Sequence, residues 1–336
     1  MDIKYGNFID LSMLKDDVLR NLKAQSEFWR KKALNLKDYT QPAKSCPICG
    51  SSGAKKAVII HGFDIMQCEK CTHAYNSQML TYENKKRFYE ATDEEINYSD
   101  TYTDAKVQEY RLEHVAKPKV TFIDKYIKSK PAKWLDLACG NGDVLSVAKE
   151  MGYEAMGVDP NPVSVKYAKT NYGLELYQST MEEYLTESNQ LFDIISLLGI
   201  TDLVSDPMVL IKRSAGLIKA NGIMAASFPN FDSFSTTVQA AFPDQIVCRH
   251  LFPTTQSSYT LDSAQHALKK AGLTVEAIYW YGMDLYELAY NMVLMNPDTK
   301  KTGLYKMLFQ FMNELQLVFD KAEKSDEFLI VARKAP

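Results

Sequence analysis

The fold is decided by the stretch Trp-Leu-Asp-Leu-Ala-Cys-Gly-Asn-Gly-Asp, which occupies residues 134–143. A short apolar run that carries one acid, Asp136, leads to two glycines one residue apart, Gly140 and Gly142. A helix-like segment follows at residues 144–149. This order predicts a strand, a tight turn and the start of a helix. Because glycine lacks a β-carbon, such a turn lets a ligand lie against bare backbone at the carboxyl end of a strand.

A second acid lies at the position that a nucleoside ligand requires. The apolar segment 155–158 ends in Asp159, which comes 17 residues after Gly142. An acid at the end of the second strand of such a unit accepts hydrogen bonds from two ribose hydroxyls. The alternative is a generic glycine-rich turn that binds nothing. The spacing between the turn and Asp159 favours an enzyme with a nucleoside cofactor.

The identity of the cofactor depends on the residue three positions after Gly142. A dinucleotide site needs a third glycine there, where the pyrophosphate meets the helix, and this chain has Leu145 instead. The Asp-x-x-x-Gly-x-Gly arrangement that starts at Asp136 resembles motif I of class I S-adenosylmethionine-dependent methyltransferases. The resemblance implies S-adenosylmethionine as the cofactor, whose amino acid part brings an ammonium group for the acid to hold.

Composition sets limits on the class of protein. The 336 residues include 39 Lys and Arg against 42 Asp and Glu, and the chain has no basic excess of the kind that a nucleic-acid-binding surface usually shows. Hydrophobic residues make up 46% of the chain, as in ordinary globular proteins. No apolar run is long enough to span a membrane, and the first residues carry no secretory signal pattern. We therefore expect a cytoplasmic protein whose six cysteines do not form disulfides.

The chain is predicted to fold in four parts. Apolar residues at helical spacing indicate an N-terminal helical segment over residues 1–43, and a cysteine module follows at 44–76. A tyrosine-rich helical linker at 77–132 is expected to cap the cofactor site. From 133 to 336 strand and helix patterns alternate, which predicts the methyltransferase domain.

The last part predicts an α/β fold with a doubly wound, seven-stranded, mostly parallel sheet of Rossmann-like type. The expected strands are 133–137, 154–158, 174–177, 192–198, 222–228, 273–281 and 327–333, with helices at 163–172, 207–218 and 262–271 among those between them. In the methyltransferase pattern the last strand runs antiparallel between the fifth and sixth. Two additions are expected, at 229–260 and at 282–325. The second is apolar and helical, and it is interpreted as core or as the contact of a homodimer.

The cysteine module has the spacing of a metal site. Cys46 and Cys49 form one Cys-x2-Cys pair, and Cys68 and Cys71 form a second after an 18-residue gap. Two such knuckles present four thiolates tetrahedrally, which predicts a small zinc-ribbon-like module with a closed, structural Zn²⁺ site. Iron in a rubredoxin-like site is the main alternative. A role in packing or in shaping the substrate site is favoured over nucleic-acid binding, because the module has no basic stripe.

The order of cysteine module, tyrosine-rich helices and motif I resembles bacterial class I methyltransferases that act on sugars or cell-surface polysaccharide precursors. It also resembles the zinc-bearing sugar methyltransferases of antibiotic pathways, and the similarity covers about residues 44–281. The resemblance implies cofactor contacts at the motif I turn, after the second and third strands, and at the end of the fourth. The residues at these places are Asp136, Ala138, Gly140, Gly142, Asp159, Pro160, Thr180, Met181, Leu198 and Gly199.

The chain departs from this family at the catalytic positions. Many relatives carry Glu-His after the fourth strand, where this chain has Thr201-Asp202. Many also have a histidine before a Tyr-Phe-Ser/Thr element, where this chain has Thr255. A histidine can accept a hydroxyl proton near neutral pH, so His250 is predicted as the general base with Asp202 as its orienting partner or substitute. Arg111 could hold an anionic group of the substrate.

The sequence therefore predicts a methyltransferase that modifies a hydroxyl of a small polar acceptor, such as a sugar or nucleotide-sugar in surface-glycan or secondary metabolism. Methyl transfer depends mainly on the alignment of nucleophile, methyl group and sulfur, so a missing base would not exclude activity. One alternative is an RNA or protein methyltransferase whose zinc module grips the macromolecule. The other is a non-catalytic scaffold that binds the cofactor. In motif I, a side chain introduced in place of Gly142 is expected to occupy the space of the bound cofactor.

Overall fold

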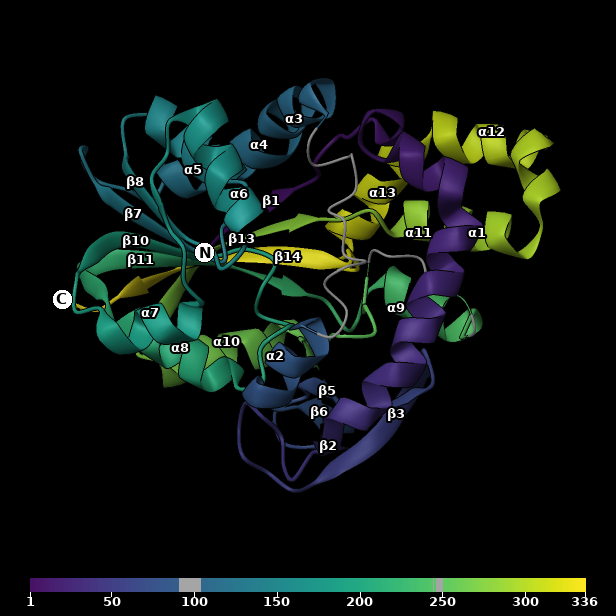
Figure 1. Ribbon diagram of the computed structural model, residues 1–336, viewed down its shortest axis with the longest axis horizontal. Helices are drawn as coiled ribbons and strands as arrows, with labels where there is room; N and C mark the ends of the chain where they lie inside the picture. Colours follow the sequence, from purple (N-terminus) through teal and green to yellow (C-terminus); the bar gives the residue numbers. More distant parts are fainter. Residues whose placement is uncertain (91–103, 244, 246–249) are drawn as a thin grey trace.

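The computed structural model describes residues 1–90, 104–243, 245 and 250–336. Its centre is an eight-stranded sheet in the order β1-β13-β14-β11-β10-β7-β8-β9 (Figure 1). The strands are β1 (Asp2–Tyr5), β7 (Lys133–Leu137), β8 (Glu154–Val158), β9 (Leu176–Tyr177), β10 (Phe192–Leu197), β11 (Ile218–Pro229), β13 (Leu273–Tyr281) and β14 (Glu327–Lys334). The predicted class of fold is confirmed.

The direction of the strands follows the methyltransferase pattern. Pairs β7–β8, β8–β9, β7–β10 and β10–β11 are parallel, and β14 runs antiparallel between β11 and β13, as expected. The number of strands differs from the expected seven, because β1 adds a parallel edge strand in which Asp2 pairs with Ala277. The four residues of β1 carry two charges and are exposed or half-buried, so they lack the apolar run that identifies a central strand.

Two layers of helices cover the sheet, one on each face (Figure 1). One layer contains α3 (Ala105–Arg111), α4 (Lys117–Asp124), α5 (Asp143–Glu150) and α6 (Pro162–Tyr167); the other contains α7 (Met181–Glu187), α8 (Pro207–Gly216) and α10 (Leu261–Lys270). Neighbouring residues of β7 point to opposite faces, as in any strand. Trp134 packs in the core with Leu145, whereas Leu135 packs in the other core with Ile211. One core is closed by the first helical layer, and the other by the second layer together with buried residues of the cysteine segment.

The cysteine segment forms a small antiparallel sheet of its own. Its strands are β3 (Ala54–Ile60), β4 (Phe63–Cys68), β5 (Ala74–Asn76) and β12 (Ser257–Ser258), in the order β12-β5-β4-β3. Beside it, β2 (Thr40–Pro42) pairs with β6 (Gln78–Leu80). The strand β12 belongs to the 229–260 addition, so residues 44–76 fold together with a segment that is distant in the sequence.

The remaining elements are helical. They are α1 (Leu11–Leu36), α2 (Tyr82–Glu90), α9 (Phe234–Ala241), α11 (Asp284–Met295), α12 (Gly303–Gln310), α13 (Met312–Lys321), the 3-10 turns Lys37–Tyr39 and Pro297–Lys301, and the π-helical turns Leu112–Ala116 and Ala168–Tyr172. The segment 282–325 contains α11, α12 and α13. Among the helices in the described part of the chain, we find none whose length and apolar character would let it cross a membrane.

Candidate cofactor site, metal centre and acceptor side

The motif I turn holds three residues in the left-handed region of the backbone. Ala138, Gly140 and Gly142 have φ angles of 56°, 55° and 81°. A β-carbon added at Gly140 would meet no heavy atom of the described chain within 4 Å. The turn therefore leaves open space beside Gly140, as a ligand that approaches the backbone requires.

The expectation for Gly142 is wrong. A β-carbon there would lie 3.1 Å from Leu174 Cδ1 and 3.5 Å from the β-carbon of Ala168, so it would point into the protein. Gly142 precedes the first residue of α5, and its role is to let the helix pack closely on the neighbouring segment. Only Gly140 of the two faces the space for a ligand.

Asp159 connects the end of β8 to the motif I turn. Its Oδ2 atom accepts a hydrogen bond from the backbone amide of Gly140 at 2.8 Å, and Oδ1 accepts one from the amide of Asn161 at 2.9 Å. The residue is 6% exposed. Burial raises the pKa of this carboxyl group, while the two amides act in the opposite direction. The acid is thus held rigidly at the edge of the turn.

Asp136 lies deeper, on β7. Its Oδ1 atom accepts a hydrogen bond from Ser196 Oγ at 2.5 Å, and Ser196 Oγ accepts one from Trp134 Nε1 at 2.8 Å. Burial raises the pKa of Asp136 to about 7, while the Ser196 hydroxyl and the charge of Lys119 lower it. A carboxyl group so poised loses its proton readily when a cation binds beside it.

A cavity of about 260 Å³ lies against this turn. Its volume is close to the lower end of the range for small-molecule sites, about 300 Å³. Four of the predicted cofactor residues line it, together with two cations and six further residues. The complete lining is Asp136, Ala138, Gly140, Leu198, Arg111, Lys119, Val115, Ala116, Cys139, Asn141, Asp143 and Val144.

The two cations of the cavity come from the helices before β7. Arg111 Nε lies 3.2 Å from Asp143 Oδ2, and Lys119 Nζ lies 4.0 Å from Glu327 Oε1. The sequence predicts Arg111 only as a contact of the substrate, and it does not identify Lys119 as a residue of the site. The one available signal was that α4 precedes motif I, which does not say which of its lysines turns toward the site.

The other predicted cofactor residues, Asp159 among them, are not in the lining of this cavity. Gly199 is exposed at the end of β10, with its amide donating to Ser227 Oγ at 2.9 Å. Thr180 caps α7 by accepting from the Glu183 amide at 3.2 Å. Met181 is buried in the core, and Pro160 is exposed directly after Asp159. Their contacts with an adenine ring stay predictions.

The four cysteines of the knuckles converge. The Sγ atoms of Cys46, Cys49, Cys68 and Cys71 all lie within 4.8 Å of one another, and two pairs are 3.6 Å and 3.5 Å apart. Tetrahedral zinc with Zn–S bonds of about 2.3 Å would hold its sulfurs about 3.8 Å apart. In the described part of the chain this is the only such group of ligands. The donor set fits a closed metal site.

The two histidines near the metal ligands, His61 and His73, lie outside the four-cysteine group. His73 is buried, with Nε2 3.2 Å from Ser257 Oγ and its ring against Tyr259. His61 lies in the β3–β4 turn, with a φ angle of 52°. Burial lowers the pKa of His61 to about 4 and that of His73 to about 3, so both are neutral.

Asp202 lies just beyond the carboxyl end of β10. Its Oδ2 atom accepts from Thr255 Oγ1 at 3.4 Å, and Lys85 donates to the neighbouring Leu203 carbonyl at 2.9 Å. Burial raises the pKa of Asp202 to about 6; the charge of Glu327 acts in the same direction and that of Lys85 opposes it. A carboxylate with this pKa can accept a proton near neutral pH.

His250, the other predicted base, is 4% exposed. Its Nε2 atom lies 3.0 Å from Thr236 Oγ1 and 3.3 Å from Ser233 Oγ, at the start of α9. Its carbonyl accepts a hydrogen bond from Gln239 Nε2. The described residues that line the motif I cavity do not include His250.

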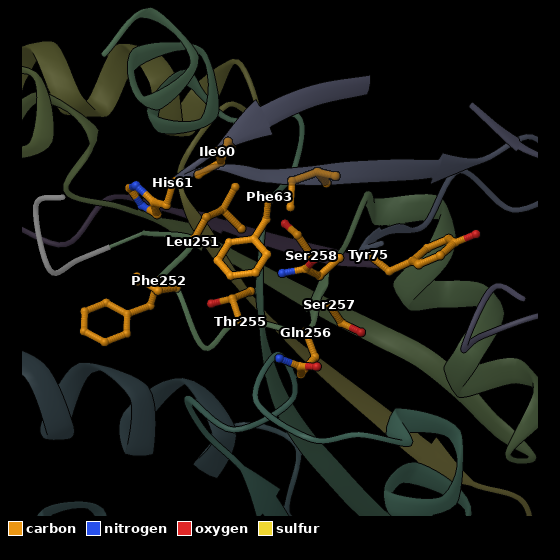
Figure 2. A pocket seen from close by; sticks show the side chains of 13 residues that line it. Ile60, His61, Phe63, Tyr75, Leu251, Phe252, Thr255, Gln256, Ser257 and Ser258 are labelled. Carbon is orange, nitrogen blue, oxygen red and sulfur yellow. The ribbon is translucent and has the colours of Figure 1, made fainter. Parts of the chain in front are cut away.

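A second cavity lies between the β3–β4 hairpin and the loop that leads into β12 (Figure 2). Ile60, Phe63 and Leu251 form its apolar wall, and Thr255 and Gln256 contribute polar groups. Its volume is about 20 Å³, enough for about one water molecule. This gap marks the seam between the metal module and the main domain, and it is too small for an acceptor.

The doubly wound sheet, the antiparallel β14 and the motif I turn together define a Rossmann-like methyltransferase fold. A family model described as "Methyltransferase domain" matches residues 71–278, and the chain belongs to this family.

Curated relatives and solved structures show what the chain is similar to. The ubiquinone biosynthesis O-methyltransferase of Azorhizobium caulinodans is 29% identical over 106 residues, which are 30% of this chain and 42% of that protein. The enzyme of the same name from Coxiella burnetii is 30% identical over 135 residues, 38% of this chain and 58% of that one. The chain thus spans about half the length of the curated relatives it matches. A SAM-dependent methyltransferase structure from Archaeoglobus fulgidus has a TM-score of 0.45 and 18% identity, covering 67% of this chain and 97% of that one.

Proposed function

We propose that the protein transfers the methyl group of S-adenosylmethionine to a hydroxyl oxygen of a small polar acceptor, most specifically a sugar or nucleotide-sugar. The observation that carries the proposal is the hydrogen bond between Asp159 and the Gly140 amide beside an open cavity. Asp159 would take the ribose hydroxyls, and Asp136 would face the ammonium group. Arg111 and Lys119 supply positive charge for the carboxylate of the methionine part.

Asp202 is the better supported of the two candidate bases. It follows β10, whose end borders the cofactor cavity through Leu198, and its raised pKa suits proton transfer. His250 remains the second proposal, with Asp202 as its orienting partner. The acceptor would then bind beyond the carboxyl ends of β10 and β11, where ligands of open α/β sheets bind.

A phenolic hydroxyl is the second candidate acceptor, because the curated relatives carry the name of ubiquinone biosynthesis O-methyltransferases. An RNA or protein acceptor is less well supported, since the net charge is −3 and the metal module pairs Lys56 with Asp64 rather than presenting a basic stripe. A non-catalytic scaffold would bind the cofactor without consuming it.

Methyl-labelled S-adenosylmethionine separates these candidates. The protein should be incubated with nucleotide-sugars, glycan extracts, polyprenyl phenols and total RNA, and the labelled product identified in each case. We expect label in a sugar fraction together with formation of S-adenosylhomocysteine. Label found only in phenols or only in RNA would mean that this class, and not a sugar, is the acceptor. Binding of the cofactor without turnover in any fraction would support a non-catalytic scaffold.

Three further expectations belong to the same proposal. We propose Zn²⁺ as the structural ion of the four cysteines and a cytoplasmic location, where thiols stay reduced. We also propose a homodimer through the 282–325 addition. Large apolar side chains lie exposed on α12, on α13 and at the residue between them, namely Leu304, Met307, Phe311, Leu315 and Val318. Sedimentation of the wild type against Met307→Lys tests whether this surface joins two copies.

A further inference from the structure

We propose that Gln256 is a positioning residue that ties the four-cysteine metal centre to Asp202, so that metal binding fixes the backbone that carries this carboxylate. The link between metal and loop stands on contacts alone. The role of Asp202 as the catalytic base rests on the proposed function.

The metal module is closed by a strand from the main domain. In β12, Ser257 pairs with Tyr75 and Ser258 pairs with Ala74 of β5. Two side-chain contacts reinforce this pairing next to the knuckle of Cys68 and Cys71. Thr72 Oγ1 lies 2.5 Å from Thr260 Oγ1, and His73 Nε2 lies 3.2 Å from Ser257 Oγ. Any loss of order at this knuckle therefore reaches β12 directly.

Gln256 uses all its polar groups to join separate segments. Its carbonyl accepts from the Asn76 amide at 3.0 Å, and its Oε1 atom accepts from the Leu80 amide at 2.6 Å. Its Nε2 atom donates to the Thr254 carbonyl at 2.9 Å, and its amide donates to the Asp202 carbonyl at 2.7 Å. The residue is 1% exposed, so water cannot replace these bonds cheaply.

The far end of this path holds Asp202 at two points. Its carbonyl accepts hydrogen bonds from the amides of Gln256 and Ser257, at 2.7 Å and 3.2 Å. Its carboxylate accepts one from Thr255 at 3.4 Å. Three consecutive residues of the β12 loop thus fix both the main chain and the side chain of Asp202.

Metal binding supplies the free energy that orders this path. In small four-cysteine modules the free energy of metal binding is also free energy of folding. Without the ion, the knuckle after β4 loses its main constraint, and β5 loses the support that it passes to β12 and Gln256. The core that holds Trp134 contains none of the four cysteines, whereas the core that holds Leu135 includes Cys46, Cys68 and Cys71. We therefore expect the loss to stay on the metal side of the sheet and to leave the strands β7 and β8 paired.

Hydrogen exchange with mass spectrometry tests this coupling in the full chain without an acceptor. In the wild type, stripping the metal with a chelator should speed exchange of the Gln256 and Ser257 amides by about tenfold or more. The amides of β7 and β8 should change by less than about twofold. Unchanged exchange at Gln256 and Ser257 after complete metal removal would overturn the proposal.

The variant Gln256→Met separates coupling from packing, because methionine keeps the volume and loses both side-chain hydrogen bonds. The metal should still bind, and the same amides should exchange fast with or without chelator. Gln316→Met is the matched control, since Gln316 is another buried glutamine, bonded to Asp284 and Asp320 away from this path. It should keep the chelator response of the wild type. A full response in Gln256→Met would contradict the role of this side chain.

Two readouts distinguish this proposal from the proposed function. Calorimetry with S-adenosylmethionine on the same samples should show affinity within about twofold of the wild type for Gln256→Met, because the cofactor cavity lies elsewhere. Absent binding in every sample would refute the proposed function and leave the exchange result standing. With an accepted substrate, Gln256→Met should shift the acidic limb of the pH–rate profile, and Gln316→Met should leave it unchanged. An unchanged acidic limb in Gln256→Met would refute the link to Asp202.

Discussion

The Oδ2 atom of Asp159 accepts a hydrogen bond from the backbone amide of Gly140 at 2.8 Å. This contact joins the ends of two neighbouring parallel strands, β7 and β8, at the edge of one cavity. A ribose that binds to Asp159 must therefore lie next to the part of the turn that a β-carbon would obstruct. The hydrogen bond therefore holds the motif I turn and Asp159, the two features that predict the cofactor site from the sequence, in one fixed arrangement.

The two glycines of the turn should respond differently to valine. Both substitutions strain a left-handed backbone, at about 1–2 kcal/mol for a β-carbon. Gly140→Val should also fill the cavity and weaken S-adenosylmethionine binding by about 100-fold or more, or about 2.8 kcal/mol. Gly142→Val should push against Leu174 and lower the melting temperature further. Thermal unfolding and calorimetry on both variants check this, and equal effects on affinity at equal stability would contradict the assignment.

Cofactor affinity should depend on pH through Asp136. Its pKa is raised to about 7 in the free protein, so below that pH most molecules carry a neutral carboxyl group. An ammonium group binds better to the ionised form. Affinity should therefore fall as pH drops from 7.5 to 5.5, by up to about tenfold per pH unit. Titrations at several pH values should show this slope for the wild type and a flat profile for Asp136→Asn.

The stability of the cofactor-free protein should show the opposite sign. A carboxyl group whose pKa is raised on folding contributes stability that is present below the pKa of the unfolded chain, about 3.9. That contribution is lost as pH rises through about 7. The difference between the unfolding free energies of the wild type and Asp136→Asn, measured between pH 6 and pH 8, gives the pH-dependent contribution of Asp136 to stability. If the difference between the two proteins does not change over this range, Asp136 does not titrate there.

One metal ion per chain should be found in protein purified without a chelator. Cys68→Ser should release it and destabilise the sheet of β3, β4, β5 and β12, because metal binding and folding are linked. Cys139→Ser is the control, since Cys139 lies in the cofactor cavity and not among the metal ligands. Elemental analysis gives the metal content, and an absence of both zinc and iron would refute the metal site.

Loss of the general base should lower turnover without affecting the cofactor. Asp202→Asn should reduce the rate of methyl transfer by about 10²-fold or more and leave S-adenosylmethionine affinity unchanged. His250→Ala should cost less than about tenfold if Asp202 is the base. The reverse order would assign the proton to His250, and small effects of both would leave alignment as the source of catalysis.

Much of the main sheet could be predicted because its strands carry strong local signals. The runs that became β7, β8 and β13 are largely apolar, and their predicted bounds agree with the structure; β8 ends just before Asp159 and β13 just before Gly282. The strand β9 is shorter than expected, and β1 was missed, because short edge strands have little apolar pattern. The partnership of β12 with β5 joins residues far apart in the sequence, and no local pattern encodes it.

In the candidate site, too, local sequence patterns predict some residues and tertiary packing places the others. Motif I and the cysteine pairs have fixed spacings, so their residues were identified from sequence, whereas the direction of a β-carbon at Gly142 depends on how Leu174 packs. The position of Lys119 in the cavity likewise follows from helix packing. Spacing predicts which backbone approaches a ligand, and tertiary contacts decide which side chains surround it.

The most direct test of the cofactor assignment is calorimetry of S-adenosylmethionine and NAD with the wild type and Asp159→Ala. We expect the wild type to bind S-adenosylmethionine more tightly than NAD. Asp159→Ala should weaken that binding by about 1.5–3 kcal/mol, the value of hydrogen bonds to a charged group. Tighter binding of NAD, or unchanged affinity in a folded Asp159→Ala protein, would contradict the assignment.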